Sequence, residues 1–123
     1  MSATMIGKLT LDHAAHIEVE VSESDGGHDF IIDTGFSDFL YLPEDIIAAW
    51  NLPFLGTAPM TLADQRVIIA DVYEATMDWF GSSHRVTVTA GSVGCDSLLG
   101  MRLLEGYRIE LDDVNSEVRL ERL

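Results

Sequence analysis

The tripeptide Asp33-Thr34-Gly35 is the most informative place for chemistry in this sequence. It follows the apolar run Phe30-Ile31-Ile32, which we expect to be buried on both faces, and it precedes a second apolar run over residues 39–42. A carboxylate at the end of a buried strand is costly unless its charge is paired or neutralised. Because functional sites accept such costs, Asp33 is the leading candidate for proton-transfer chemistry.

Three other groups of residues are less suited to chemistry. His13 and His16, with Asp12 nearby, would need a helix to converge on a metal ion, whereas this region predicts a turn and a strand. Cys95 with a distant histidine could form a thiol nucleophile pair, but a small buried apolar residue in a loop is the simpler interpretation. Residues 91–94 lack the lysine and the helix of a phosphate-binding loop. We therefore expect no metal site.

The remaining histidines and both tryptophans predict structural roles. His28 and His84 stand alone in the sequence and are expected at the surface. Trp50 and Trp79 are expected in the core, where large aromatic side chains pack.

The composition predicts one folded domain over residues 1–123. A chain of 123 residues with 47% apolar residues can bury a core without disulfides. The net charge of −14 repels nucleic-acid phosphates and anionic lipid, so we expect neither as a partner. No apolar run is long enough to cross a bilayer, and the first residues lack the features of a signal peptide. The single cysteine, Cys95, suits a reducing cytoplasm, where we expect the protein to act.

The first half of the chain predicts strands that lead to Asp33. Strict alternation over residues 16–21 predicts a half-buried strand. A turn at Asp25-Gly26-Gly27 then predicts a hairpin whose return strand covers residues 28–33. A further strand is expected over residues 39–42, and Pro43 opens a short helix with acidic residues in its first turn.

The middle of the chain predicts a hairpin with a polar tip. Apolar residues 60–62 and 67–69 flank Ala63-Asp64-Gln65-Arg66. The strand after this tip is expected to continue to Phe80, and alternation over residues 86–90 predicts the next strand.

The end of the chain predicts a short helix and a final hairpin. The apolar triplet Leu98-Leu99-Gly100 precedes a helix over residues 101–105, which ends at Gly106. Residues 107–111 and 117–120 predict the hairpin. About eight short strands and two short helices in total predict an all-β fold.

Together these features resemble the retropepsin-like aspartic proteases, the single-domain group that includes the retroviral proteases, and most closely its small prokaryotic members. The resemblance covers residues 8–120 and implies an acid-protease barrel with two short helices. It rests on four features in order: Ile32-Asp33-Thr34-Gly35, the helix after Leu42-Pro43, the hairpin tipped at Asp64, and Leu98-Leu99-Gly100 followed by Met101-Arg102-Leu103-Leu104.

The resemblance implies that Asp33 works with its copy from a second chain, because one chain supplies only one such triplet. Two carboxylates about 3 Å apart cannot both ionise, so they hold one proton between them. The ionised member takes a proton from water while the protonated member polarises the peptide carbonyl, with no metal, cofactor or covalent intermediate. The implied function is that of an aspartic endopeptidase, a homodimer that acts on peptide or protein substrates.

The resemblance also implies supporting roles around Asp33. Thr34 would donate its hydroxyl across the dimer, Gly35 would leave room for the two carboxylates, and Leu98-Leu99-Gly100 would pack beneath the Asp33 loop. Ala63-Asp64-Gln65-Arg66 would form the tip of a short flap that lacks a glycine. Each has a plainer interpretation: strand packing for Thr34, a turn residue for Gly35, core for the triplet and a surface hairpin for the flap.

This chain also departs from the pattern of many retroviral relatives. Phe36 and Ser37 replace an alanine and an acid after the triplet, and Met101 replaces a basic residue after the second glycine. Phe36 is bulky and is expected to narrow the cleft. Asp38 is available to line the cleft, although a solvated loop acid is the simpler interpretation. These departures keep two alternatives open: a non-catalytic dimeric module on the same fold that binds a peptide or protein, and a structural dimer without a ligand.

Overall fold

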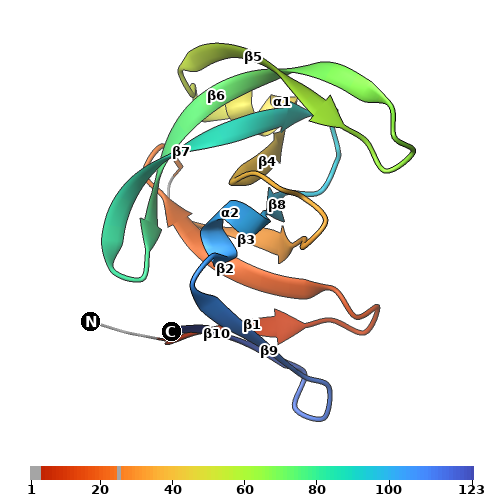
Figure 1. The fold of residues 1–123 in the computed structure, drawn as a ribbon. Coiled ribbons are helices and arrows are strands. Elements are labelled where there is room, and N and C mark those ends of the chain that lie inside the picture. Colours follow the sequence, from red (N-terminus) through yellow and green to blue (C-terminus); the bar gives the residue numbers. More distant parts are fainter. Residues whose placement is uncertain (1–3, 25) are drawn as a thin grey trace.

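The computed structural model describes residues 4–24 and 26–123, and the turn expected at Asp25 lies outside them. The described residues form ten strands and two short helices (Figure 1), which confirms the all-β prediction. The strands are β1 (Thr4–Leu9), β2 (Ala15–Val21), β3 (Gly26–Ile32), β4 (Leu40–Pro43), β5 (Phe54–Thr61), β6 (Val67–Trp79), β7 (Ser82–Gly91), β8 (Leu98–Leu99), β9 (Tyr107–Asp112) and β10 (Glu117–Arg122). The helices are α1 (Glu44–Ala49) and α2 (Met101–Leu104). Neither described helix has the length or the apolar content that crossing a membrane requires.

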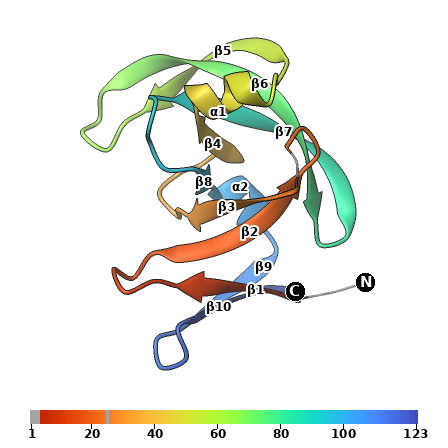
Figure 2. The same cartoon turned by 180° about the vertical axis from the view of Figure 1, so that it is seen from behind.

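The strands pair into one sheet in the order β5-β6-β7-β4-β8-β3-β2-β1-β10-β9. A further pairing joins Val21 of β2 to Met77 of β6, so the sheet curls back on itself around the core. Figures 1 and 2 show β5–β7 at one end of the molecule and β1, β9 and β10 at the other. The terminal strands β1 and β10 pair with each other inside the chain, in antiparallel register from Thr4↔Glu121 to Lys8↔Glu117.

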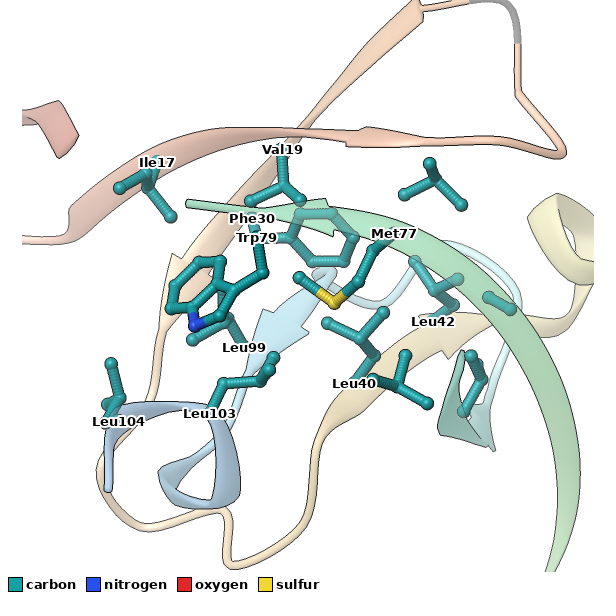
Figure 3. Packing of buried hydrophobic residues seen from close by; sticks show 14 of the residues in the cluster. Ile17, Val19, Phe30, Leu40, Leu42, Met77, Trp79, Leu99, Leu103 and Leu104 are labelled. Atoms are coloured by element: carbon teal, nitrogen blue, oxygen red, sulfur yellow. The ribbon is translucent and has the colours of Figure 1, made fainter. Parts of the chain in front are cut away.

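The core lies inside this curled sheet. Figure 3 shows side chains from β3, β4, β6, β8 and α2 meeting there, among them Phe30, Leu40, Met77 and Leu99. Trp79 is 4% exposed, as predicted for a core aromatic residue. Burial of such large apolar side chains is the main favourable contribution to folding.

Three of the predicted core positions differ from expectation. Only Phe30 of the Phe30-Ile31-Ile32 run is fully buried, while Ile31 and Ile32 are half-buried, so burial on both faces was wrong. The reason is that one face of β3 packs on the core, where Ile32 joins Phe30, and Ile31 points the other way. Trp50 is only partly buried and packs against the margin of the core.

The strand count exceeds the prediction because β1 and β8 were not predicted as strands. The two-residue strand β8 is too short to show alternation, and it exists because it lies between β3 and β4. Strand β5 begins earlier than expected and contains Pro59. It tolerates the proline because it is an end strand of the sheet, where a backbone N–H is not needed for pairing.

Candidate active site

Asp33 directly follows the last residue of β3 and is fixed by the strand beneath it. Strand β8 runs parallel to β3, with Ile31 opposite Leu98 and Ile32 opposite Leu99. The backbone N–H of Asp33 donates to the Leu99 carbonyl over 2.9 Å. This hydrogen bond continues the β3–β8 ladder by one residue, so the position of Asp33 is set by the sheet.

The Asp33 side chain folds back on its own loop. Its Oδ1 atom accepts a hydrogen bond of 2.8 Å from the Gly35 N–H, and its carbonyl accepts one of 3.1 Å from the Phe36 N–H. Oδ2 accepts no hydrogen bond from the described residues. Asp33 is half-buried, whereas Thr34 and Gly35 are exposed on the loop. The hydrogen bond from Gly35 to Oδ1 therefore orients the carboxylate, and Oδ2 remains available for another hydrogen-bond partner.

Backbone hydrogen bonds from the start of α2 hold the loop that follows Asp33 in place. The Gly100 N–H donates to the Phe39 carbonyl and the Met101 N–H to the Phe36 carbonyl, each over 2.8 Å. A Cβ atom on Gly100 would overlap the Asp38 carbonyl oxygen and would lie 2.6 Å from Cδ2 of Phe36. Only glycine leaves the room that this close approach requires.

A cavity of about 650 Å³ opens above Asp33. The Asp33 loop and Leu98 line one side of it, and the β5–β6 hairpin lines the other. Of the described residues around it, Asp33 and Asp38 are the ionisable ones, and the rest are apolar or neutral. Both ribbon views place the tip of this hairpin on the side of the molecule where β3 ends (Figures 1 and 2). The cavity thus combines a carboxylate with a largely apolar wall.

The hairpin tip covers part of this cavity and has a regular turn. The Leu62 N–H donates to the Arg66 carbonyl over 2.8 Å, and the Gln65 N–H donates to the Leu62 carbonyl over 3.0 Å. Gln65 has φ of 72°, the left-handed conformation that glycine usually supplies in such turns. Ala63 and Gln65 line the cavity, whereas Asp64 and Arg66 do not and instead pair with each other over 2.6 Å.

Phe36 forms part of the floor instead of narrowing the cleft, so that expectation was wrong. Its side chain is 7% exposed and packs edge-to-face against Tyr41, with 5.7 Å between ring centroids. The space it occupies is the space that Gly100 leaves free. Ser37 lies beside it at the cavity, and Met101 is exposed at the start of α2.

Of the two interpretations of Asp38, the structure agrees with a residue that lines the cleft and not with a solvated loop acid. Asp38 is half-buried at the cavity, where its Oδ1 atom accepts hydrogen bonds from the Phe39 N–H (2.9 Å) and the Thr87 hydroxyl (3.2 Å). Thr87 lies on β7, far away in the sequence, so no local pattern could have indicated the pair.

His28 is not the surface residue that the sequence predicted, whereas His84 is exposed. The Nε2 atom of His28 lies 2.8 Å from the Ser97 hydroxyl, and its ring contacts Trp50 edge-on at 4.9 Å. Burial lowers the pKa of His28, although the charge of nearby Asp29 opposes this shift.

The other candidate groups do not converge on a site. His13 lies 3.6 Å from Asp113, while His16 lies 2.6 Å from Asp29, so the two histidines have separate partners. Residues 4–24 and 26–123 contain no group of three metal-ligating side chains. Burial raises the pKa of the Cys95 thiol, which disfavours the thiolate that a nucleophile needs.

Comparisons with known proteins support the fold. No protein-family model matches this chain, and no curated protein matches its sequence. Among solved structures, it is similar to a retropepsin-like aspartic protease from Rickettsia conorii, with a TM-score of 0.66 and 20% sequence identity over 97% of this chain and 90% of that chain. The chain therefore has the retropepsin-like all-β fold that its sequence resembles.

Proposed function

We propose that this protein is an aspartic endopeptidase in which Asp33 from each of two identical chains forms the catalytic pair. The observation that carries this proposal is the position of Asp33 at the floor of the cavity, held by Leu99 from below and covered by a hairpin from above. The solved structure with a similar fold, named as a retropepsin-like aspartic protease, supports the same reaction class.

The geometry assigns a separate task to each carboxylate oxygen. Oδ1 of Asp33 accepts the Gly35 N–H, which fixes the plane of the carboxylate. Oδ2 is then the atom that meets the second Asp33 and shares a proton with it, because two neighbouring carboxylates cannot both stay ionised. A water molecule held between the pair loses its proton to the ionised member and attacks the peptide carbonyl that the protonated member polarises.

The cavity suits a peptide in an extended conformation. An extended chain between the floor and the β5–β6 hairpin can form strand-like main-chain hydrogen bonds, while its side chains enter the spaces on alternate sides. Met60, Val72 and Leu98 line these spaces, so we expect apolar side chains near the bond that is cut.

The decisive experiment compares the wild type with Asp33→Asn on a mixed peptide library between about pH 4 and 7. We expect the wild type to cut and the variant to lose all detectable cutting. Asp113→Asn, which changes an exposed loop acid, is the matched control and should cut as the wild type does. Cutting that persists in Asp33→Asn would overturn the proposal.

The pH profile gives a second test of the same pair. Cutting should fall at high pH, once the shared proton is lost, and a flat profile up to about pH 9 would contradict a carboxylate pair. The alternative function is a peptide-binding module on the same fold without catalysis. Peptide binding of equal strength in the wild type and Asp33→Asn, without cutting in either, would establish that alternative.

A further inference from the structure

We propose that Asp38 selects a basic side chain, lysine or arginine, in the peptide that occupies the cavity above Asp33. Asp38 lines this cavity, and the one other ionisable group among the described lining residues is Asp33 itself. The described lining includes no lysine, arginine or histidine. This inference rests on the proposed function, because it names the class of peptide that the same cleft takes.

The hydrogen bonds of Asp38 leave one carboxylate oxygen without a partner from the chain. Oδ1 accepts the Phe39 N–H and the Thr87 hydroxyl, which together fix the orientation of the carboxylate. Oδ2 accepts no hydrogen bond from residues 4–24 and 26–123. A half-buried carboxylate gains most from a donor that also carries a positive charge, because charge-assisted hydrogen bonds are about twice as strong as neutral ones.

The arginines near Asp38 do not neutralise its charge. The backbone N–H of Arg102 donates to the Asp38 carbonyl over 3.3 Å, but its guanidinium lies over the Phe39 ring, 5.1 Å from the centroid. Arg85 lies two residues before Thr87 on the same face of β7, and it is exposed. Among the described residues, no ion pair includes Asp38. The carboxylate charge therefore remains available to a bound peptide.

The rest of the cavity and the charge of the whole molecule favour the same class of peptide. The long stem of a lysine or arginine can lie along the apolar wall of the cavity while its charged end reaches Asp38. The net charge of −14 attracts cationic peptides and repels acidic ones over a longer range. That long-range attraction acts on any cationic peptide, whereas Asp38 would select a particular position in its sequence.

The two-fold symmetry of the proposed dimer gives a specific pattern of cutting. Two identical chains would bring one Asp38 to each side of the bond that is cut. We therefore expect a lysine or arginine on either side of that bond, within a few positions of it, while apolar side chains lie next to the bond.

The test uses the mixed peptide library on the wild type, with the cut sites identified by mass spectrometry. We expect lysine and arginine to be enriched on either side of the cut bond, and no enrichment would overturn the proposal. The best-cut peptide is then resynthesised with lysine, glutamine, norleucine or glutamate at the enriched position. The value of kcat/KM should be roughly tenfold higher for lysine than for glutamine or norleucine, and lowest for glutamate. Equal values for lysine and glutamine would also overturn the proposal.

Asp38→Asn tests the residue directly. It removes the charge but keeps an oxygen that can accept from the Phe39 N–H and the Thr87 hydroxyl. The preference for lysine over glutamine should fall to within about twofold, while cutting of the glutamine peptide persists.

Asp71→Asn is the matched control. Asp71 is exposed on β6 between Ala70 and Val72, which line the cavity, so its side chain points to the opposite face of the strand. This variant removes the same charge from the molecule and should keep the full preference. Equal loss of preference in Asp38→Asn and Asp71→Asn would assign the effect to net charge and overturn a subsite at Asp38.

Two further measurements work even where Asp38→Asn does not fold. Acetylation of the peptide lysine keeps the stem but removes the charge, so kcat/KM of the wild type should fall roughly tenfold; an unchanged value would overturn the proposal. Binding of the lysine and glutamine peptides to Asp33→Asn, measured by fluorescence anisotropy, separates the two proposals. Tighter binding of the lysine peptide, without cutting by the wild type, would support the Asp38 subsite and overturn the endopeptidase. Cutting by the wild type without any preference would do the reverse.

Discussion

Gly100 shows how a single residue shapes the floor beneath Asp33. Its missing side chain lets the Phe36 ring and the Asp38 carbonyl approach the start of α2. We expect Gly100→Ala to lower the free energy of unfolding by about 1–3 kcal/mol, because the added methyl group overpacks a rigid backbone site. Urea denaturation followed by circular dichroism measures this change.

Gly94→Ala is the matched control for this prediction. Gly94 has a φ of +82°, and a Cβ atom there would meet nothing within 4 Å, so its substitution tests backbone conformation without crowding. It should cost about 1 kcal/mol. Only Gly100→Ala should also impair peptide cutting, and equal effects of the two variants on cutting would contradict a specific role for the floor.

His28 gives a prediction about pH. Its pKa is lowered by burial, so the unfolded chain takes up a proton at about pH 6.5 while the folded chain does not. The His28 contribution to stability is therefore complete above that pH, falls as the pH drops below it, and levels off once the folded state is also protonated. His28→Gln should flatten this part of the urea-denaturation profile, whereas His84→Gln, at an exposed position, should leave it unchanged. Identical profiles for both variants would contradict the assignment.

The positions of residues were predictable where the signal was local. The position of Asp33 at the end of an apolar strand was visible in the sequence, since the strand and the loop are adjacent in the chain. The environments of Asp38 and His28 were not, because their partners Thr87 and Ser97 come from distant segments. Side-chain hydrogen bonds between remote segments depend on the completed sheet and leave no periodic pattern in the sequence.

At the scale of elements, the tip of the β5–β6 hairpin has a strained residue at a position where turns usually have glycine. Gln65 adopts φ of 72°, where a Cβ atom is unfavourable. We expect Gln65→Gly to raise the free energy of unfolding by about 0.5–1 kcal/mol, since relief of strain exceeds the added flexibility of the unfolded chain. Ala63→Gly, in the same turn but at negative φ, should lower it by a similar amount. Changes of the same sign in both variants, measured by urea denaturation, would contradict this account.

The elements also differ in how far the sequence could define them. Strands with strict alternation, such as β2 and β7, were predicted because one face of each is buried. Strand β8 was missed because two residues are too few to show a periodic pattern. It is a strand because it pairs with β3 and β4 on either side. The element that supports Asp33 from below is thus the one whose strand character the sequence showed least.

At the scale of the whole molecule, the net charge of −14 opposes both compaction and association. Among the described residues, three arginines pair with carboxylates at the surface and two histidines each contact one, whereas the chain has 21 Asp and Glu residues against 7 Lys and Arg residues. Surface pairs of this kind contribute little to stability. Repulsion among the remaining carboxylates is therefore the larger electrostatic effect.

Added salt should stabilise this protein at neutral pH, because screening weakens that repulsion more than it weakens a few exposed ion pairs. Between about 20 and 300 mM NaCl we expect the free energy of unfolding to rise by roughly 1 kcal/mol, or Tm by roughly 3–5 °C for a chain of this length. Near pH 4.5, where carboxylates take up protons, the same salt increase should have a much smaller effect. A melting temperature that falls with salt at neutral pH would show that the exposed ion pairs, including those of Arg108 and Arg119, outweigh the repulsion.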